Sequence, residues 1–145
     1  MEESLSRETA GQYSPLTLAF VGDGVFDLVI RTMVTTSAGN RPVKKLHREK
    51  AAIVNAHAQA QMAEVIRPYL TDEEKGIFRR GSNAHSVTVA RNQTISDYRT
   101  ATGLEALCGW LYMTGQMKRL MELIEKGLTG MREAIGKEDA HGQEG

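Results

Sequence analysis

Two acidic residues stand out because each lies in a stretch that is otherwise almost entirely apolar. Asp23 occurs in LAFVGDGVFDLVI, and Glu105 occurs in TGLEALCGWLYM. Glycine lies on both sides of Asp23, while Gly103 and Gly109 lie close to Glu105. A glycine inside a helix costs about 1 kcal/mol relative to alanine. Its repeated use here predicts that another backbone, a metal or a substrate approaches closely.

Paired carboxylates of this kind could hold a divalent cation. A carboxylate inside an apolar helix must be ion-paired, protonated or metal-bound, and the sequence leaves these alternatives open. Carboxylate oxygen is the ligand that Mg²⁺ and Mn²⁺ prefer, and Mg²⁺ needs only one or two protein carboxylates. Such an ion can lower the pKa of a bound water and stabilise charge on a phosphodiester. Asp27 follows Asp23 by one helical turn, a spacing at which two like charges repel unless a cation lies between them.

The other nucleophilic and metal-binding residue types form no competing pattern. The sequence contains no cysteine–histidine zinc spacing, no Ser-His-Asp arrangement and no GxxxxGK[ST] phosphate loop. Cys108 is the single cysteine, and its apolar surroundings predict a buried core residue. None of the four histidines is paired at metal spacing on one helix. We expect His57 to be a packed or capping residue.

The elements that must position these acids are helices. Apolar residues recur at helical spacing almost throughout, and alternation typical of a strand is confined to residues 86–90. Ser14-Pro15 is a typical helix start, and Thr71 with Glu74 is a capping box. The predicted helices cover residues 15 to about 39, 42–67, 72 to about 80, 95–114 and 116–135, with a loop at 81–93. The sequence therefore predicts an all-α domain at 14–136, with a tail at 1–13 and a disordered tail at 137–145.

Charge is balanced over the whole chain but not along it. Lysine and arginine together number 18, as do aspartate and glutamate. Basic residues concentrate at 41–50 and 75–99, whereas acidic residues gather near the two ends. Since binding depends on local potential, the basic segments could form one phosphate-facing surface; the alternative is two ordinary solvated helix faces. The sequence shows no membrane span and no signal-peptide layout, so we expect a cytoplasmic protein.

The two acidic segments resemble the motifs of the ribonuclease III family. LAFVGDGVFDLVI is similar to the family signature Leu-Glu-Phe-Leu-Gly-Asp-Ser-Val-Leu, and TGLEALCGWLYMTG is similar to its second acidic motif. Between them, LHREKAAIVNAHAQAQMAEVI resembles the family's second conserved helix. The resemblance covers about residues 14–128 and implies a ribonuclease III endonuclease-domain-like helical bundle. It also implies a double-strand-specific endoribonuclease that depends on Mg²⁺, with Mn²⁺ as a substitute, and leaves 5′-phosphate products.

The chain length and the segment RRGSNAHS resemble the Mini-III subgroup, whose members lack a separate double-stranded RNA-binding domain. That subgroup implies a homodimer. It also implies maturation of the ends of the large-subunit (23S) ribosomal RNA precursor. A large-subunit ribosomal protein is then expected to assist by shaping the RNA.

The resemblance assigns roles to individual residues. Asp23 and Glu105 match the family's catalytic, metal-binding acids. Two further family acids are replaced by Ala19 and Thr102, which leaves open whether one or two ions bind. Phe20 matches a family phenylalanine that inserts into the partner subunit, the alternative being plain core packing. The residues expected to bind RNA are basic side chains of the two segments, namely Lys44, Lys45, Arg48, Arg79, Arg80 and Arg91, and the loop at 81–93 is expected to contact a groove.

Some roles and some classes of protein stay open. Asp27 could assist the metal through water, or it could be an ordinary helix-surface or interface residue. A non-catalytic double-stranded RNA-binding protein could keep the nuclease fold, and the losses at Ala19 and Thr102 are consistent with that. The presence of both Asp23 and Glu105 argues against it. A helical interaction module with no role in RNA metabolism would ignore duplex RNA at any salt concentration.

Overall fold

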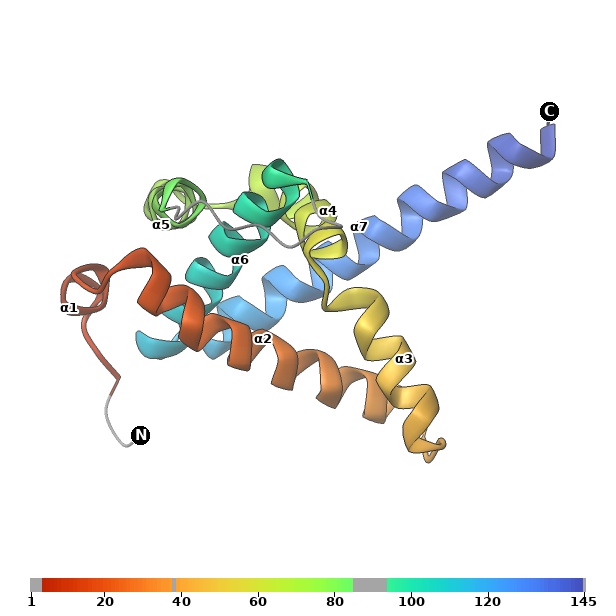
Figure 1. The fold of residues 1–145 in the computed structure, drawn as a ribbon, viewed down its shortest axis with the longest axis horizontal. Helices are drawn as coiled ribbons and strands as arrows, with labels where there is room; N and C mark the ends of the chain where they lie inside the picture. The colour runs from red at the N-terminus through yellow and green to blue at the C-terminus, as the bar shows by residue number, and fades with distance from the viewer. Residues whose placement is uncertain (1–3, 38, 85–93, 145) are drawn as a thin grey trace.

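The computed structural model describes residues 4–37, 39–84 and 94–144, with side chains described as far as residue 137. Every regular element in these ranges is helical, which confirms the all-α prediction (Figure 1). The elements are α1 (Arg7–Gly11), α2 (Pro15–Ser37), α3 (Val43–Ile53), α4 (Ala56–Ile66), the 3₁₀ turn η1 (Arg67–Tyr69), α5 (Asp72–Asn83), α6 (Ile95–Met113) and α7 (Met117–Glu144). No helix in the described ranges combines the length and apolar character that crossing a membrane requires.

Helix α6 forms the centre of the molecule. It packs against α2, α5, α4 and α7 (Figure 1). Every residue from Ala101 to Leu111 is buried except Glu105, which is half-buried. A helix enclosed on all sides needs apolar residues around its whole circumference, and this explains why the sequence of α6 has no polar face. Phe26 and Ile30 of α2 extend the same core.

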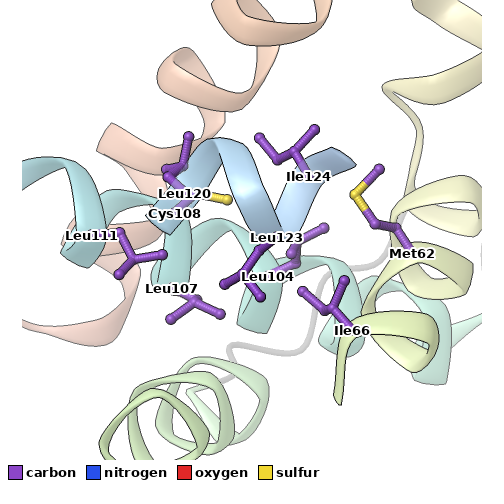
Figure 2. A pocket seen from close by; sticks show the side chains of 9 residues that line it. All are labelled: Met62, Ile66, Leu104, Leu107, Cys108, Leu111, Leu120, Leu123 and Ile124. Atoms are coloured by element: carbon purple, nitrogen blue, oxygen red, sulfur yellow. The ribbon is translucent and has the colours of Figure 1, made fainter. Parts of the chain in front are cut away.

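Helices α4 and α7 close the core on another side of α6. Figure 2 shows nine side chains, among them Met62, Cys108 and Ile124, converging on one small void. The void measures about 10 Å³ and is lined by aliphatic and sulfur-containing side chains. A water molecule needs roughly that much space and several polar partners. This void therefore offers no ligand site.

Glycine residues allow α2 and α6 to approach until their backbones touch. A Cβ atom on Gly22 would lie 1.6 Å from the carbonyl oxygen of Glu105, and one on Gly109 would lie 2.0 Å from that of Leu18. Any side chain at either position would prevent this contact. A Cβ atom on Gly24 would have nothing within 4 Å. The close approach predicted from the glycines is therefore confirmed for Gly22, where the approaching group is backbone.

Replacing Gly109 by alanine should force α2 away from α6. Overpacking typically costs about 1–3 kcal/mol, and the added methyl group meets rigid backbone here. We expect the free energy of unfolding to fall by about 3 kcal/mol in urea denaturation. Gly76→Ala is the control, because its Cβ meets nothing within 4 Å and alanine is about 1 kcal/mol better than glycine in a helix. A Gly109→Ala variant as stable as the parent would contradict the backbone contact.

The single helix predicted for residues 42–67 is wrong, because the structure divides it into α3 and α4. Asn55 starts the second helix: its side-chain oxygen accepts a hydrogen bond from the Ala58 N–H at 2.9 Å. Its amide nitrogen also donates to the Ala51 carbonyl at 2.9 Å. An asparagine that binds backbone groups on both sides favours a helix boundary. The apolar stripe continues through the break, so periodicity alone did not reveal it.

The chain ends also differ from the prediction. Residues 4–13 are not a free tail, since the Leu5 N–H donates to the Met113 carbonyl at 2.8 Å and Ala10 is fully buried. At the other end α7 continues to Glu144, so the tail predicted as disordered is helical. Helix α7 runs through Gly136, because a helix tolerates an isolated glycine at a cost of about 1 kcal/mol. Helix α5 extends through Asn83, and the remainder of the predicted loop, residues 85–93, lies outside the described residues.

Candidate functional site

Asp23 and Glu105 meet at the contact between α2 and α6. The close packing of Gly22 against the Glu105 backbone sets the relative position of α2 and α6 at this contact. Burial raises the pKa of Glu105 to about 8, and a hydrogen bond with Asp23 and the Asp23 charge add to the increase. The two carboxyl groups therefore face each other within hydrogen-bonding reach. Asp23 is exposed and Glu105 half-buried, so the pair opens to the surface.

Neither carboxylate is neutralised by a neighbouring cation. Among the side chains that the structure describes, no salt bridge of an arginine, lysine or histidine involves Asp23 or Glu105. The ion-paired alternative is thus excluded for this part of the chain. Two unneutralised carboxylates side by side disfavour each other's charged form, and a cation bound between them would remove that conflict.

The donor set fits a hard divalent cation. Both ligands offer oxygen, which Mg²⁺ and Mn²⁺ prefer over the nitrogen and sulfur ligands typical of zinc. Within the described residues, no group of three or more acidic, histidine or cysteine side chains is placed to share a metal. An ion held by Asp23 and Glu105 would take its remaining ligands from water, as Mg²⁺ commonly does.

The comparisons with known proteins identify the family. The family profile described as Ribonuclease III domain matches residues 16–116. The chain belongs to the ribonuclease III family. A Mini-ribonuclease 3 of Thermoanaerobacter sp. (strain X514) is 44% identical over 123 residues, which cover 85% of this chain and 86% of the relative. One of Staphylococcus aureus (strain NCTC 8325 / PS 47) is 38% identical over 122 residues, covering 83% and 90%. These matches confirm the resemblance seen in the two acidic motifs.

A solved structure supports the same assignment. The X-ray crystal structure of a Fusobacterium nucleatum protein aligns with a TM-score of 0.72 at 32% sequence identity. The alignment covers 79% of this chain and 92% of that one. The helical fold predicted from the ribonuclease III resemblance is therefore confirmed.

The two positions where ribonuclease III family acids are missing carry no ligand for a metal. Ala19 is buried in the core. Thr102 is also buried, and its hydroxyl donates to the Tyr98 carbonyl of the preceding turn at 2.9 Å. A hydroxyl that is used by its own helix is not free to bind an ion. Of these four positions, Asp23 and Glu105 are the two that carry a carboxylate in this chain.

Asp27 is engaged by cations rather than free to assist a metal. Its Oδ1 accepts from Lys50 Nζ at 3.1 Å, and its Oδ2 accepts from Arg31 Nε. Burial raises the pKa of this carboxyl, but the hydrogen bonds from Arg31 and Lys50 outweigh burial and hold the pKa below its ordinary value. Of the two roles left open by the sequence, the structure favours the helix-surface ion pair.

The predicted RNA-binding residues fall into two separate groups. Lys44, Lys45 and Arg48 are exposed on α3, and Arg79 and Arg80 are exposed on α5. Arg80 Nη1 also donates to the Gly11 carbonyl at 3.0 Å. Helix α5 lies near the N-terminal end of α2, and α3 lies near its C-terminal end (Figure 1). Within one chain the two basic segments therefore do not form one continuous surface, and Arg91 lies outside the described residues.

Phe20 projects from α2 into solvent. The exposed fraction of Phe20 is 81%. Leu16, four residues before it, and Leu28, eight residues after it, are 45% and 65% exposed. Plain core packing of Phe20 within the chain, the alternative left by the sequence, is therefore wrong. The three side chains form an uncovered apolar stripe on the helix that carries Asp23.

The structure also tests the predictions for Cys108 and His57. Burial raises the pKa of the Cys108 thiol to about 12, with a contribution from the Glu105 charge, and the prediction of a buried core cysteine is confirmed. His57 is exposed rather than packed, and its Nδ1 lies 3.0 Å from Asp97 Oδ2. Periodicity could not predict this pair, because the partners are 40 residues apart on different helices.

Proposed function

We propose that this chain cuts both strands of duplex RNA at a divalent metal site held by Asp23 and Glu105, and that it matures the ends of the 23S ribosomal RNA precursor. As a ribonuclease III family member the protein is a double-strand-specific endoribonuclease. The observation that supports the site is the convergence of the two carboxyl groups without a cationic partner among the described residues. If the two acids only stabilised the core through ion pairs, each carboxylate would lie beside a cation and not beside a second carboxylate.

The bound ion, Asp23 and Glu105 have different roles in the proposed reaction. Bound Mg²⁺ would supply an activated water and would stabilise charge on the scissile phosphodiester. Asp23, exposed on α2, presents its carboxylate toward the substrate side. Glu105 is held in place by the backbone contact at Gly22, so the ligand pair is preorganised. Hydrolysis forms a bond from the water oxygen to phosphorus and breaks the bond to the 3′ oxygen, which leaves a 5′-phosphate and a 3′-hydroxyl.

The exposed apolar stripe of α2 supports a homodimer. Contiguous exposed apolar side chains are typical of an interaction surface, and Leu16, Phe20 and Leu28 lie beside Asp23 on the same helix. A two-fold pairing through this stripe would bring the sites of two subunits together, so that each cuts one strand. It would also combine basic residues of both chains into a larger surface for phosphates.

Phe20→Ala should weaken this dimer strongly. A buried aromatic anchor at the centre of an interface typically contributes about 2 kcal/mol or more, which is about a 30-fold rise in Kd. Sedimentation equilibrium across a concentration series measures the change. Tyr69→Ala is the matched control, since Tyr69 is another exposed aromatic side chain but lies on η1. A parent protein that is monomeric throughout, or a Phe20→Ala variant with unchanged association, would contradict the proposed interface.

The proposed substrate is tested with duplex RNAs of matched length. One reproduces the paired ends of the 23S precursor, one has an unrelated sequence, and the separated strands serve as controls. We expect cleavage of the precursor duplex with Mg²⁺ or Mn²⁺, 5′-phosphate ends, no cleavage with a chelator, and stimulation by a large-subunit ribosomal protein. Cleavage of both duplexes at equal rates would overturn the preference for ribosomal RNA. Binding of both without cleavage would favour the non-catalytic alternative. A ribosomal RNA substrate also places the protein in the cytoplasm.

The proposed RNA contacts are the exposed basic side chains of α3 and α5. Lys44, Lys45 and Arg48 extend from one helix, and Arg79 and Arg80 from the other. A-form RNA is recognised mainly by its shape, its phosphates and its 2′-hydroxyl groups. Lysine and arginine side chains suit the phosphates. Arg91 stays in the proposed set on the basis of the sequence alone.

A further inference from the structure

Helix α3 carries three of the proposed RNA-binding cations, yet it packs only weakly against the hydrophobic core. None of its residues is buried. Leu46 and Ile53 reach the edge of the core and are only partly buried. Most helix stability in proteins comes from packing of an apolar face. The position of α3 must therefore depend on other contacts.

Ion pairs and hydrogen bonds supply those contacts along α2. Near the end of α3, Lys50 Nζ lies 3.1 Å from Asp27 Oδ1. At the start, Arg41 forms an ion pair with Glu49 and donates to the Val34 carbonyl at 2.7 Å. The side chain of Lys50 is only 21% exposed and that of Asp27 27% exposed, so water screens this pair less than a fully exposed one.

The carboxylate of Asp27 is fixed on both of its oxygens. Arg31, one turn further along α2, holds Oδ2 and leaves Oδ1 directed to Lys50. A carboxylate oriented by one cation offers the second a defined position rather than a diffuse attraction. Asp27 is thus the side chain that attaches the second half of α3 to the helix that carries Asp23, in addition to the contact between Arg41 and Val34.

We propose that Asp27 is a positioning residue for RNA cleavage, which holds the basic helix α3 one turn away from the metal ligand Asp23. This inference rests on the proposed function. The link lets Lys44, Lys45 and Arg48 hold the same duplex whose scissile phosphate lies at Asp23 and Glu105.

The alternative role of Asp27 predicts the opposite sign. A carboxylate near a phosphate backbone repels it, and its neutralisation would also release Arg31 and Lys50 for RNA contacts. If Asp27 only contributes negative charge, Asp27→Asn should lower KM for duplex RNA. If Asp27 positions α3, the same variant should raise KM, because the basic side chains lose their fixed place.

The experiment compares cleavage kinetics of the full chain and five variants on duplex RNA. Asp27→Asn should raise KM by about three- to tenfold with little change in kcat, the size expected for loss of a partly exposed ion-pair network. Asp27→Glu, which keeps the carboxylate, should recover most of the loss. Asp27→Asn combined with Lys50→Gln should be no worse than Lys50→Gln alone, since residues in one network are not additive. Glu64→Gln, which removes a carboxylate paired with Arg67, is the control for net charge.

Amide hydrogen exchange of the free variants provides a second measurement that needs no RNA. Asp27→Asn should speed exchange in α3 while α6 stays protected. A lowered or unchanged KM, or unchanged exchange in α3, would overturn the positioning role even if the parent cleaves duplex RNA normally. If the parent does not cleave duplex RNA, the proposed function fails, and faster exchange in α3 would then show a structural link without a role in cleavage, which also overturns the inference.

Discussion

Asp23→Asn will nearly abolish cleavage of duplex RNA and will make the metal-free protein more stable above about pH 8, where Glu105 is charged. A metal that stabilises charge on the phosphodiester contributes several kcal/mol to the transition state, so we expect a rate loss of at least about 100- to 1,000-fold, equivalent to about 3–4 kcal/mol. The stability gain has a separate cause. Burial and Asp23 raise the pKa of the half-buried Glu105 to about 8. Above that pH both carboxyl groups are charged and repel each other, and the amide removes one of the two charges.

Both halves of this result are measured on the same preparation. Single-turnover cleavage at saturating Mg²⁺ gives the rate, and thermal denaturation with a chelator present gives the stability. Glu125→Gln on α7 is the matched control, since it neutralises an exposed carboxylate far along the chain from the site. Cleavage by Asp23→Asn at the parental rate would remove Asp23 from the reaction. A loss of stability in the metal-free variant would show that the two carboxyl groups do not oppose each other.

The meeting of Asp23 and Glu105 could be predicted from the sequence because it depends on local patterns. Each acid lies in an apolar helix next to a glycine, and Gly22 and Gly109 are the residues that let the helices touch. Glycine is the one residue type that permits such contact, so its position in a helix is informative. The placement of the acids followed from this feature together with the family motifs.

Features that depend on distant partners could not be predicted in this way. Lys50 and Asp27 belong to different helices, and no periodicity relates them. The exposure of Phe20 followed only from the family resemblance and not from the hydrophobic pattern, because an apolar helix has the same pattern whether its face contacts the core of its own chain or a partner. The break at Asn55 depends on one side chain that binds backbone groups on both sides. Each of these is decided by tertiary or very local hydrogen bonding rather than by the hydrophobic pattern.

Glu74 and Arg119 supply the second large expected effect, which concerns folding rather than catalysis. Glu74 is 3% exposed and sits at the start of α5. Its two oxygens accept from Arg119 Nε at 2.9 Å and Nη2 at 2.8 Å, and the Thr71 N–H donates to it at 2.8 Å. Arg119 comes from α7 and also donates to the Tyr69 carbonyl at 2.7 Å. One bidentate pair therefore joins α5, η1 and α7.

Arg119→Met should destabilise the fold by about 3 kcal/mol at neutral pH, because removing one member of a buried pair leaves the other uncompensated. Urea denaturation measures this loss. Glu122→Gln, which removes the exposed partner of Arg119, should cost less than about 1 kcal/mol. A small effect of Arg119→Met would mean that water reaches Glu74 and replaces the guanidinium.

The pH dependence of the same variants separates charge from packing. Burial raises the pKa of Glu74, but hydrogen bonds from Arg119 and Thr71 outweigh it and hold the pKa below its ordinary value of 4.5. The folded-state pKa is thus below the unfolded one, so the pair stabilises the parent above pH 4.5 and this stability is lost as the pH falls through the folded pKa. In Arg119→Met the uncompensated carboxyl is easily protonated. The difference in the free energy of unfolding between parent and variant should therefore shrink as the pH falls. A difference that does not change with pH would assign the loss to the packing of the arginine side chain.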